Sequence, residues 1–332
     1  MDFATLRFIF SMRFNCICGI MRIAFAADVH GNETTWRKFI NVHKYIKGIN
    51  VLIMGGDLTG KMLVPIFKQS DGSYVCHFNV DYHIRSEKEL NDLCNTIRFS
   101  GGYPYVTTEE EWKNLTHEDR DRIMEGQMRE TLSRWIRMAD ENVPKDIQII
   151  MNPGNDDSPV VDEIIKESDR VIYPLDKVVR LDDHHEMISC EYVNPTPWKT
   201  PRELPEDELL KLLESKLNGV SVDMDHLICN FHAPPYNSGL DNAPELDKDL
   251  RPKHGVKGIS IIPVGSKAVR TFIEKYQPKL GLHGHIHESS AARKIGKTLC
   301  VNPGSGYMEG TLRLYVIDVE KDRIKDHWRI TG

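Results

Sequence analysis

The segment RIAFAADVHGN, residues 22–32, indicates the fold class because it joins a buried strand to a polar loop. Small and apolar side chains fill residues 22–27, as in a strand covered on both faces. The segment TTWRKFINVHKYIKG that follows, residues 34–48, has the apolar spacing of a helix and ends on a glycine. NVLIMGGDLTG, residues 50–60, repeats the strand-to-loop pattern. The sequence therefore predicts a strand–helix–strand unit with two parallel neighbouring strands.

Polar residues follow both of these strands, and open α/β sheets place their ligands at strand carboxyl ends. Asp28 and Asp57 occupy this position after the first and second strand. The same pattern of an apolar strand followed by a polar loop recurs in three later segments, DIQIIMNPGNDD (146–157), DHLICNFHAPPY (225–236) and KLGLHGHIHES (279–289). We therefore expect polar side chains from five strand ends to emerge at one rim of the sheet structure.

Composition limits the classes of function. The chain has 332 residues, 40% hydrophobic and 28% charged, which predicts one large globular domain with insertions or two smaller ones. Its 43 basic and 49 acidic residues give a net charge of −6, so nucleic acid is disfavoured as a partner and no membrane is expected. Seven cysteines without a C-x-x-C pair predict free thiols in a reducing compartment, hence a cytoplasmic protein.

Two segments depart from the alternation of strands and helices. Residues 1–20 contain Arg7 and Arg13, which make them a poor membrane span, and no small-residue cleavage site follows. We predict that they form an N-terminal extension, not necessarily native, and that residues 21–332 form the functional domain. Residues 61–145 are predicted to be an insertion or cap over the main sheet, and the charged helix within it, residues 117–142, to be solvated.

The segment GLHGHIHES, residues 281–289, contains three alternating histidines. Fourteen histidines in 332 residues give about 0.6 H-x-H pairs by chance, so the segment alone fits a metal site or a polar surface equally well. The other strand ends carry carboxylate, imidazole and amide groups, which suit Mn²⁺, Fe²⁺ and Zn²⁺. There are too many for one tetrahedral ion, and no cysteine is among them. Two ions that share one carboxylate fit this set best.

The ordered set D-x-H, G-D, G-N, H and G-H-x-H resembles the calcineurin-like metallophosphoesterases from Met21 to near the C-terminus, apart from residues 61–145. NPTPWKTPRE, residues 194–203, with the acidic helix after it, is similar to a poorly characterised prokaryotic branch of that family. The resemblance implies an α/β fold, specifically a four-layer α/β/β/α sandwich. It further implies a first ion on Asp28, His30 and His287, a bridging Asp57, and a second ion on Asn155, His232 and His285.

The resemblance also implies the reaction. Two cations about 3.5–4 Å apart clamp a phosphate and lower the pKa of a shared water, and the resulting hydroxide attacks phosphorus. The predicted function is therefore metal-dependent hydrolysis of a small phosphodiester or phosphomonoester. His283 lies outside the motif and is expected to be structural. The sequence does not identify substrate-binding residues; we expect them in residues 61–145 and in the loop 236–258.

One position departs from the family pattern, which reads G-N-H-D or G-N-H-E. Here Asp156 replaces the histidine expected near the scissile phosphate. Near two cations an aspartate should be ionised, so it is a poor proton donor and repels phosphate. Either Asp156 turns away, or the leaving group needs little help, or another residue supplies the acid. The candidates for that acid are His77, His83 and His254.

Three alternatives remain at the level of sequence. A nuclease of the same superfamily would need a basic groove, which the net charge of −6 does not favour. A binding or scaffold module with weak or no catalysis would be expected to lose ligands, yet the set departs only at Asp156. The segment DDHHE, residues 182–186, also has metal-ligand composition, but we predict a solvated turn because it lies between strand segments. Arg98 is predicted to make a surface ion pair.

Overall fold

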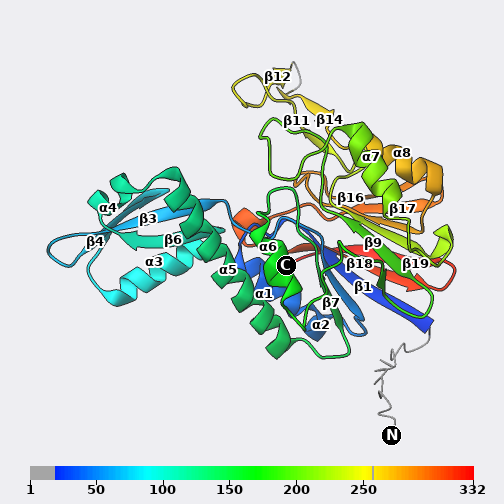
Figure 1. The fold of residues 1–332 in the computed structure, drawn as a ribbon, viewed down its shortest axis with the longest axis horizontal. Coiled ribbons are helices and arrows are strands. Elements are labelled where there is room, and N and C mark those ends of the chain that lie inside the picture. Colours follow the sequence, from blue (N-terminus) through cyan, green and yellow to red (C-terminus); the bar gives the residue numbers. More distant parts are fainter. Residues whose placement is uncertain (1–18, 256–257) are drawn as a thin grey trace, which may run out of the picture.

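The structure is a computed structural model that describes residues 19–255 and 258–332, and two β-sheets packed face to face form its centre (Figure 1). The first sheet has the strand order β19-β18-β1-β2-β7, in which β1, β2 and β7 are parallel. Ile23 pairs with Val51, so the predicted parallel pairing is confirmed. The strands are β1 (Ile20–Ala26), β2 (Val51–Met54), β7 (Gln148–Met151), β18 (Arg313–Glu320) and β19 (Ile324–Thr331).

The second sheet has the strand order β16-β17-β15-β10-β9-β8. Its inner strands β17, β15, β10 and β9 are parallel, and β16 and β8 pair antiparallel at its edges. β8 and β9 are joined by the turn around residue 183, which the sequence placed between strand segments. The strands are β8 (Val179–Arg180), β9 (Glu186–Cys190), β10 (Leu227–Phe231), β15 (Leu280–Leu282), β16 (Ala291–Ile295) and β17 (Thr298–Asn302).

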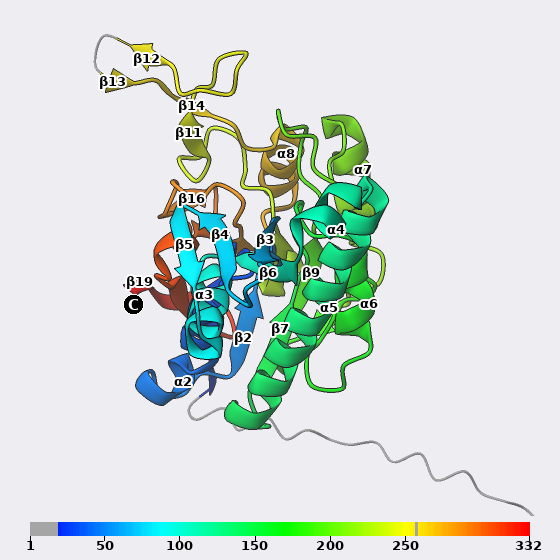
Figure 2. The same ribbon diagram turned by 90° about the vertical axis from the view of Figure 1, so that its left-hand side faces the viewer.

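Helices cover the outer face of each sheet, which gives the predicted four-layer α/β/β/α sandwich (Figures 1 and 2). Alternate residues of β1 serve opposite layers: Ile23 and Phe25 pack between the sheets, whereas Ala24 and Ala26 face the helices. The helices on the first sheet are α1 (Glu33–Ile40), α2 (Val42–Tyr45), α5 (His117–Asn142) and α6 (Val160–Lys166); those on the second are α7 (Glu206–Ser215) and α8 (Lys267–Tyr276).

Most of the predicted insertion forms a small separate layer beside the sandwich, drawn in cyan in Figure 1. Its sheet has the order β5-β4-β3-β6, and it has its own hydrophobic core around Ile66 and Ile97. The elements are β3 (Met62–Lys68), β4 (Tyr74–Phe78), β5 (Val80–Ile84), α3 (Glu87–Phe99), β6 (Gly102–Thr107) and α4 (Glu109–Asn114).

The helix α5 differs from its prediction as a solvated cap helix. It buries Leu132 and Trp135 in the core of the first sheet, and the Trp135 ring stacks on Trp36 with centroids 5.2 Å apart. Most residues of this helix are charged or polar, so the apolar stripe of Met128, Leu132 and Trp135 is hard to recognise in the sequence. The predicted block of residues 61–145 therefore includes a helix that covers the central sheet.

A second projection leaves the opposite edge of the molecule between residues 242 and 263 (Figure 2). It consists of two short two-stranded sheets; the 3-10 helices η2 and η3 lie elsewhere in the described part of the chain. These elements are β11 (Asn242–Pro244), β12 (His254–Gly255), β13 (Gly258–Ile259), β14 (Ile261–Pro263), η2 (Met224–His226) and η3 (Tyr307–Glu309).

The predicted N-terminal extension falls outside the described residues except for Gly19 and Ile20, and Ile20 already pairs with Glu320 in the first sheet. Among the described residues, no helix combines the length and the apolar character needed to cross a membrane.

Candidate metal centre

The five polar strand ends of the sequence analysis gather at one rim of the sandwich. Asp28, Asp57 and Asn155 follow the parallel strands β1, β2 and β7 of the first sheet. His232 follows β10 and His285 follows β15, both in the second sheet. Because the core between the sheets holds these parallel strands together, their carboxyl ends meet across the interface.

Ligand atoms at this rim form two groups that share one residue. The first group contains Asp28, His30, Asp57 and His287; the second contains Asp57, His232 and His285. Within each group, one potential ligand atom per residue lies within 4.8 Å of all the others. Six of the seven predicted ligands are thus in these groups, and Asn155 joins the second through its Oδ1, 3.1 Å from His232 Nε2.

The first group has the geometry of donors that face a common point. Nε2 of His30 lies 3.0 Å from Nε2 of His287, and 3.7 Å from Asp57 Oδ2. Nε2 of His287 lies 3.7 Å from Asp28 Oδ1. The Nδ1 atom of His30 is buried without a hydrogen-bond partner.

Hydrogen bonds that involve backbone groups fix the positions of the histidines in the second group. His232 Nδ1 lies 3.0 Å from the Gly55 carbonyl, which places a proton on Nδ1 and directs Nε2 towards the oxygens of the cluster. That Nε2 lies 3.4 Å from Asp57 Oδ2, the same oxygen that approaches His30. The His285 ring lies 5.5 Å from that of His232, and its backbone N–H donates to the Asp28 carboxylate.

Burial gives the cluster the electrostatics of a cation site. Asp28 is 0% exposed and Asp57 1% exposed, and two carboxylates rarely share so dry a space without a countercharge. Burial disfavours the charged form of Asp57, but His232 and His30 hold the pKa of this carboxyl well below its usual value. Burial lowers the pKa of His30 to about 3 and of His285 to about 4, so both imidazoles are neutral donors at neutral pH. At His232 and His287 the carboxylates of Asp57 and Asp28 outweigh burial and raise the pKa, at His232 to about 9, so a cation bound there would displace a proton. The residues present therefore fit divalent cations.

Backbone strain also concentrates here. Asp28, His30, Asp57 and His285 have φ values of 60°, 40°, 51° and 67°, in the left-handed region that residues other than glycine rarely adopt. Such strain persists only where surrounding structure enforces it, and it is common at functional sites. The loops after β1 and β2 enforce it through hydrogen bonds from His30 N to Asp57 O and from Gly31 N to Leu58 O.

A buried carboxylate behind the cluster joins two of its loops. Asp157 accepts hydrogen bonds from the backbone N–H groups of Leu58, Thr59 and Gly154 and from the Thr59 hydroxyl. Gly154 permits this close approach, because a Cβ there would lie 2.2 Å from Asp57 Oδ1. Asp157 therefore fixes the loop that carries Asp57 against the loop that carries Asn155.

The segment 194–203, which the sequence linked to a branch of the family, supports Asn155 from outside. Asn155 Nδ2 donates to the Thr200 hydroxyl at 3.0 Å, which orients the amide oxygen towards His232. The Arg202 backbone N–H donates to the Asn155 carbonyl, and its guanidinium donates to the Asp157 carbonyl and binds Asp162. Sequence reasoning missed Thr200 and Arg202 as site residues, because no motif links them to Asn155.

Asp156 has one contact with the shared carboxylate and one with a lysine. Its backbone N–H donates to Asp57 Oδ1 at 3.0 Å, and its carboxylate forms an ion pair with Lys61. Burial and the Asp57 carboxylate raise the pKa of Asp156 to about 6, against the effect of Lys61. Sequence reasoning also missed Lys61, together with Tyr307, whose ring lies 4.6 Å from that of His30.

The other sequence candidates lie outside the cluster. His77 and His83 are on β4 and β5 of the insertion, where His77 binds Asp81, and His254 is on β12. His283 is fully buried with Nδ1 against the carbonyls of Phe231 and Ala233, and burial lowers its pKa to about 4, as for a structural histidine.

Three further sequence features can be located in the structure: the turn 182–186, the segment NPGSG and Arg98. The turn 182–186 is not solvated throughout as predicted, because His185 is buried against Asp182; neither residue belongs to a metal-ligand group among the described residues. The segment NPGSG follows β17, and its Ser305 hydroxyl donates to the Asp28 carbonyl. Arg98 lines a small cavity together with Glu33 and Arg134.

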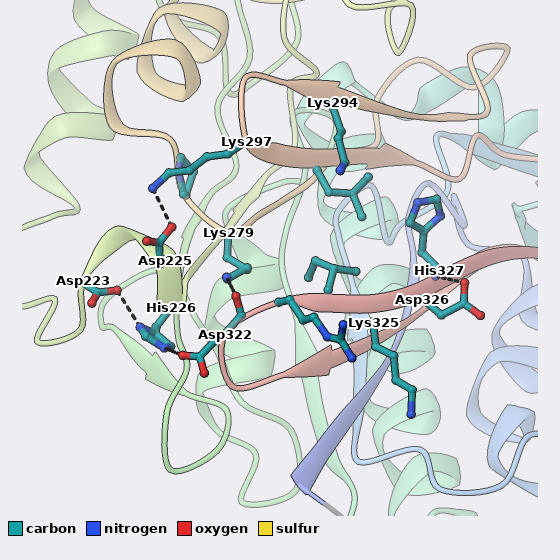
Figure 3. Close-up of a pocket in the computed structure, with 14 residues that line it drawn as sticks. Asp223, Asp225, His226, Lys279, Lys294, Lys297, Asp322, Lys325, Asp326 and His327 are labelled. Carbon is teal, nitrogen blue, oxygen red and sulfur yellow. Dashed lines mark hydrogen bonds and ion pairs between the residues drawn. The ribbon is translucent and has the colours of Figure 1, made fainter.

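A cavity of about 690 Å³ lies at the other end of the second sheet (Figure 3). Lys279, His226 and Lys297 line it, just before β15, β10 and β17, so it is near the amino ends of these strands. The metal-centre candidates follow the carboxyl ends. This cavity therefore does not belong to the candidate centre.

Comparison with known proteins bears on the fold. No family model matches the chain. "Uncharacterized protein MJ1162" from Methanocaldococcus jannaschii is 32% identical over 159 residues, which are 47% of this chain and 64% of that protein. The chain thus spans less than two-thirds of the length of this relative.

Two solved structures align over nearly the whole chain. TT1561 of Thermus thermophilus gives a TM-score of 0.52 at 13% identity, over 94% of this chain and 98% of that one. Another gives a TM-score of 0.55 at 15% identity, over 92% of this chain and 98% of that one. At these identities the likeness shows a shared α/β fold and nothing about activity.

Proposed function

We propose that this protein is a metal-dependent phosphoester hydrolase with a centre for two divalent ions. One observation carries the proposal: two groups of buried ligand atoms share Asp57, whose Oδ2 lies 3.7 Å from His30 Nε2 and 3.4 Å from His232 Nε2. The first ion would be held by Asp28, His30, Asp57 and His287, and the second by Asp57, Asn155, His232 and His285.

Two such ions, when bound, polarise a phosphoester and lower the pKa of a water molecule enough for it to attack phosphorus. The residues of the chain supply the geometry. Asp57 offers one oxygen to both groups while its other oxygen accepts the Asp156 N–H. His232 is oriented by the Gly55 carbonyl, and Asn155 by Thr200. Such supporting hydrogen bonds fix the position of metal ligands.

The mixed oxygen and imidazole donors are compatible with Mn²⁺, Fe or Zn²⁺. We infer a small phosphodiester or phosphomonoester as substrate, because the net charge of −6 offers nucleic acid no general attraction. The five cysteines within the described residues are free thiols, which supports the reducing, cytoplasmic compartment inferred from sequence.

The experiment is metal analysis of the purified protein together with assays on bis-aryl, mono-aryl and cyclic-nucleotide phosphoesters with added Mn²⁺. We expect two ions per chain and hydrolysis of at least one of these small esters. A His77→Gln variant, altered at an exposed histidine of the insertion, should keep both ions and is the matched control for loss of a histidine.

Each other result identifies a different alternative. Two ions without hydrolysis would contradict the hydrolase and favour a binding or scaffold module. Hydrolysis restricted to DNA or RNA would favour a nuclease. A protein that binds no divalent ion would contradict the proposed centre itself.

A further inference from the structure

The Lys61–Asp156 ion pair lies where the resemblance leads one to expect a histidine. Lys61 is the residue before β3, at the point where the insertion leaves the sandwich, four residues after Asp57. Asp156 follows Asn155 directly, and its backbone N–H donates to Asp57. The pair therefore connects the loop of the shared carboxylate with the loop of a proposed ligand of the second ion.

The two partners differ in exposure, which sets their roles. The Asp156 side chain is 13% exposed, whereas that of Lys61 is 54% exposed. The carboxylate is thus the more buried partner, and the exposed ammonium lies near enough to Asp57 and Tyr307 for both to raise its pKa. A lysine ammonium has three donors, so a bond to Asp156 leaves others for a ligand.

The charge of Lys61 reaches the metal-centre residues. Burial of His30 is the main cause of its lowered pKa, and the positive charge of Lys61 lowers that pKa further. Burial also disfavours the ammonium form of Lys61, but Asp156 outweighs it and raises the pKa of Lys61. The lysine is therefore a permanent cation beside the centre at neutral pH.

An unpaired Asp156 would oppose the proposed reaction, because a carboxylate next to Asn155 and Asp57 would repel a phosphate bound at the centre. The ion pair cancels that charge. It also holds a hydrogen-bond donor beside the loops that carry Asp57 and Asn155, on the side of Tyr307, whose ring lies against that of His30.

We propose that Lys61 contacts the phosphoryl group of the substrate in place of the missing histidine, and that Asp156 is the residue that positions it. This inference rests on the proposed function. As the attacking water loses a proton to solvent and its oxygen bonds to phosphorus, the bond from phosphorus to the leaving oxygen breaks. The electron pair of that bond stays on the leaving oxygen, and the Lys61 ammonium donates a hydrogen bond to the developing negative charge. Water supplies the proton that finally neutralises the leaving group, so Lys61 keeps its own.

The alternative is an ion pair that only stabilises the fold, and exposed pairs of that kind usually contribute little. Phosphate binding separates the two interpretations, because a structural pair would not change it. The test compares Mn²⁺-loaded wild type with Lys61→Met and Lys61→Arg, and the probe is inorganic phosphate, titrated calorimetrically. Lys113→Met is the matched control, since Lys113 is an exposed lysine paired with Glu109 in the insertion.

We expect Lys61→Met to keep both ions and to bind phosphate about tenfold or more weakly, the effect of losing one charge-assisted hydrogen bond. Lys61→Arg and Lys113→Met should bind phosphate nearly as wild type does. In the Lys61→Met background, Asp156→His should recover part of the lost affinity, because an imidazole then replaces the unpaired carboxylate.

Turnover provides a second readout. Lys61→Met should slow the hydrolysis of phenyl esters more than that of 4-nitrophenyl esters, because the poorer leaving group develops more charge. Unchanged phosphate affinity in Lys61→Met would overturn the inference, as would loss of the ions in both Lys61 variants. Should wild type hydrolyse no ester while Lys61→Met still loses phosphate affinity, the proposed function would fail and the Lys61 contact would stand.

Discussion

Two clusters of charged residues lie at opposite ends of the sandwich and differ in how their side chains are paired. At the carboxyl ends of the strands, two buried carboxylates face four imidazoles, and His30 Nδ1 has no hydrogen-bond partner. At the amino ends, in the cavity of Figure 3, Lys297 binds Asp225 and His226 lies between Asp223 and Asp322. Both clusters combine acidic side chains with basic ones, so their composition does not distinguish them.

The difference is burial. The residues of the cavity are largely exposed and form ion pairs with one another. Water can hydrogen-bond to the polar atoms that these pairs leave without a partner. Most residues of the candidate centre are withdrawn from water, with His285 and His287 only half-buried, and their ligand atoms lie close together in two groups. Convergent and buried donors are typical of a cation site, whereas paired and exposed charges need no ligand.

The largest effect should follow from removal of the shared carboxylate. Asp57→Asn should abolish binding of at least one ion and slow hydrolysis on the order of a thousandfold, because metal-ion stabilisation contributes several kcal/mol. Metal analysis and initial rates measure both effects. Asp225→Asn in the amino-end cavity is the control and should change neither; equal losses in the two variants would refute the distinction.

A substitution behind the centre should reduce stability. Arg202 is buried, binds Asp162 and donates to the Asp157 carbonyl, so Arg202→Met would leave Asp162 without its ion-pair partner. We expect unfolding free energy to fall by about 3 kcal/mol, typical for breaking a buried pair. Urea denaturation measures this, and a loss below the error of the method would show that the pair is dispensable.

A smaller effect should come from the residue that orients Asn155. Thr200→Val removes the hydroxyl that accepts the Asn155 N–H but keeps the shape of the side chain. Affinity for one of the two ions should fall by about 10- to 100-fold, as for other residues that support metal ligands. Competition with a chelator measures the affinity. Thr196→Val, at a hydroxyl that binds Glu203 in the same segment, is the control and should weaken affinity less.

The smallest effect should be found in the amino-end cavity. Lys297→Met breaks the exposed pair with Asp225, so we expect unfolding free energy to change by less than about 1 kcal/mol. Thermal unfolding and metal analysis are the measurements. A change in bound metal or activity would mean that the two ends of the sandwich are coupled.

Much of the fold and the ligand set could be predicted from local sequence. Each of Asp28, Asp57 and His232 follows an apolar run of strand length and has a glycine or proline within three positions, so nearby residues predict its place at a strand end. Helix α5 shows the limit of this reasoning, because its charged majority suggested a solvated helix although Leu132 and Trp135 have helical spacing and fill the core.

The supporting residues could not be predicted in this way. Lys61 and Asp156 are 95 residues apart, and Asn155 and Thr200 are 45 apart, with no periodicity to connect them. An isolated lysine or threonine has many possible partners. Which one it meets depends on how the loops are placed.

Local sequence was enough to establish the alternation of strands and helices, the polar residues at the strand ends and the oxygen and nitrogen donors among them, because these depend on neighbours along the chain. Tertiary packing was needed to bring the rims of two separate sheets together, to place Asp57 between two groups of donors, and to set Lys61 over Asp156. These contacts arise from burial of the apolar surface between the sheets, which acts across the whole chain and leaves no local pattern.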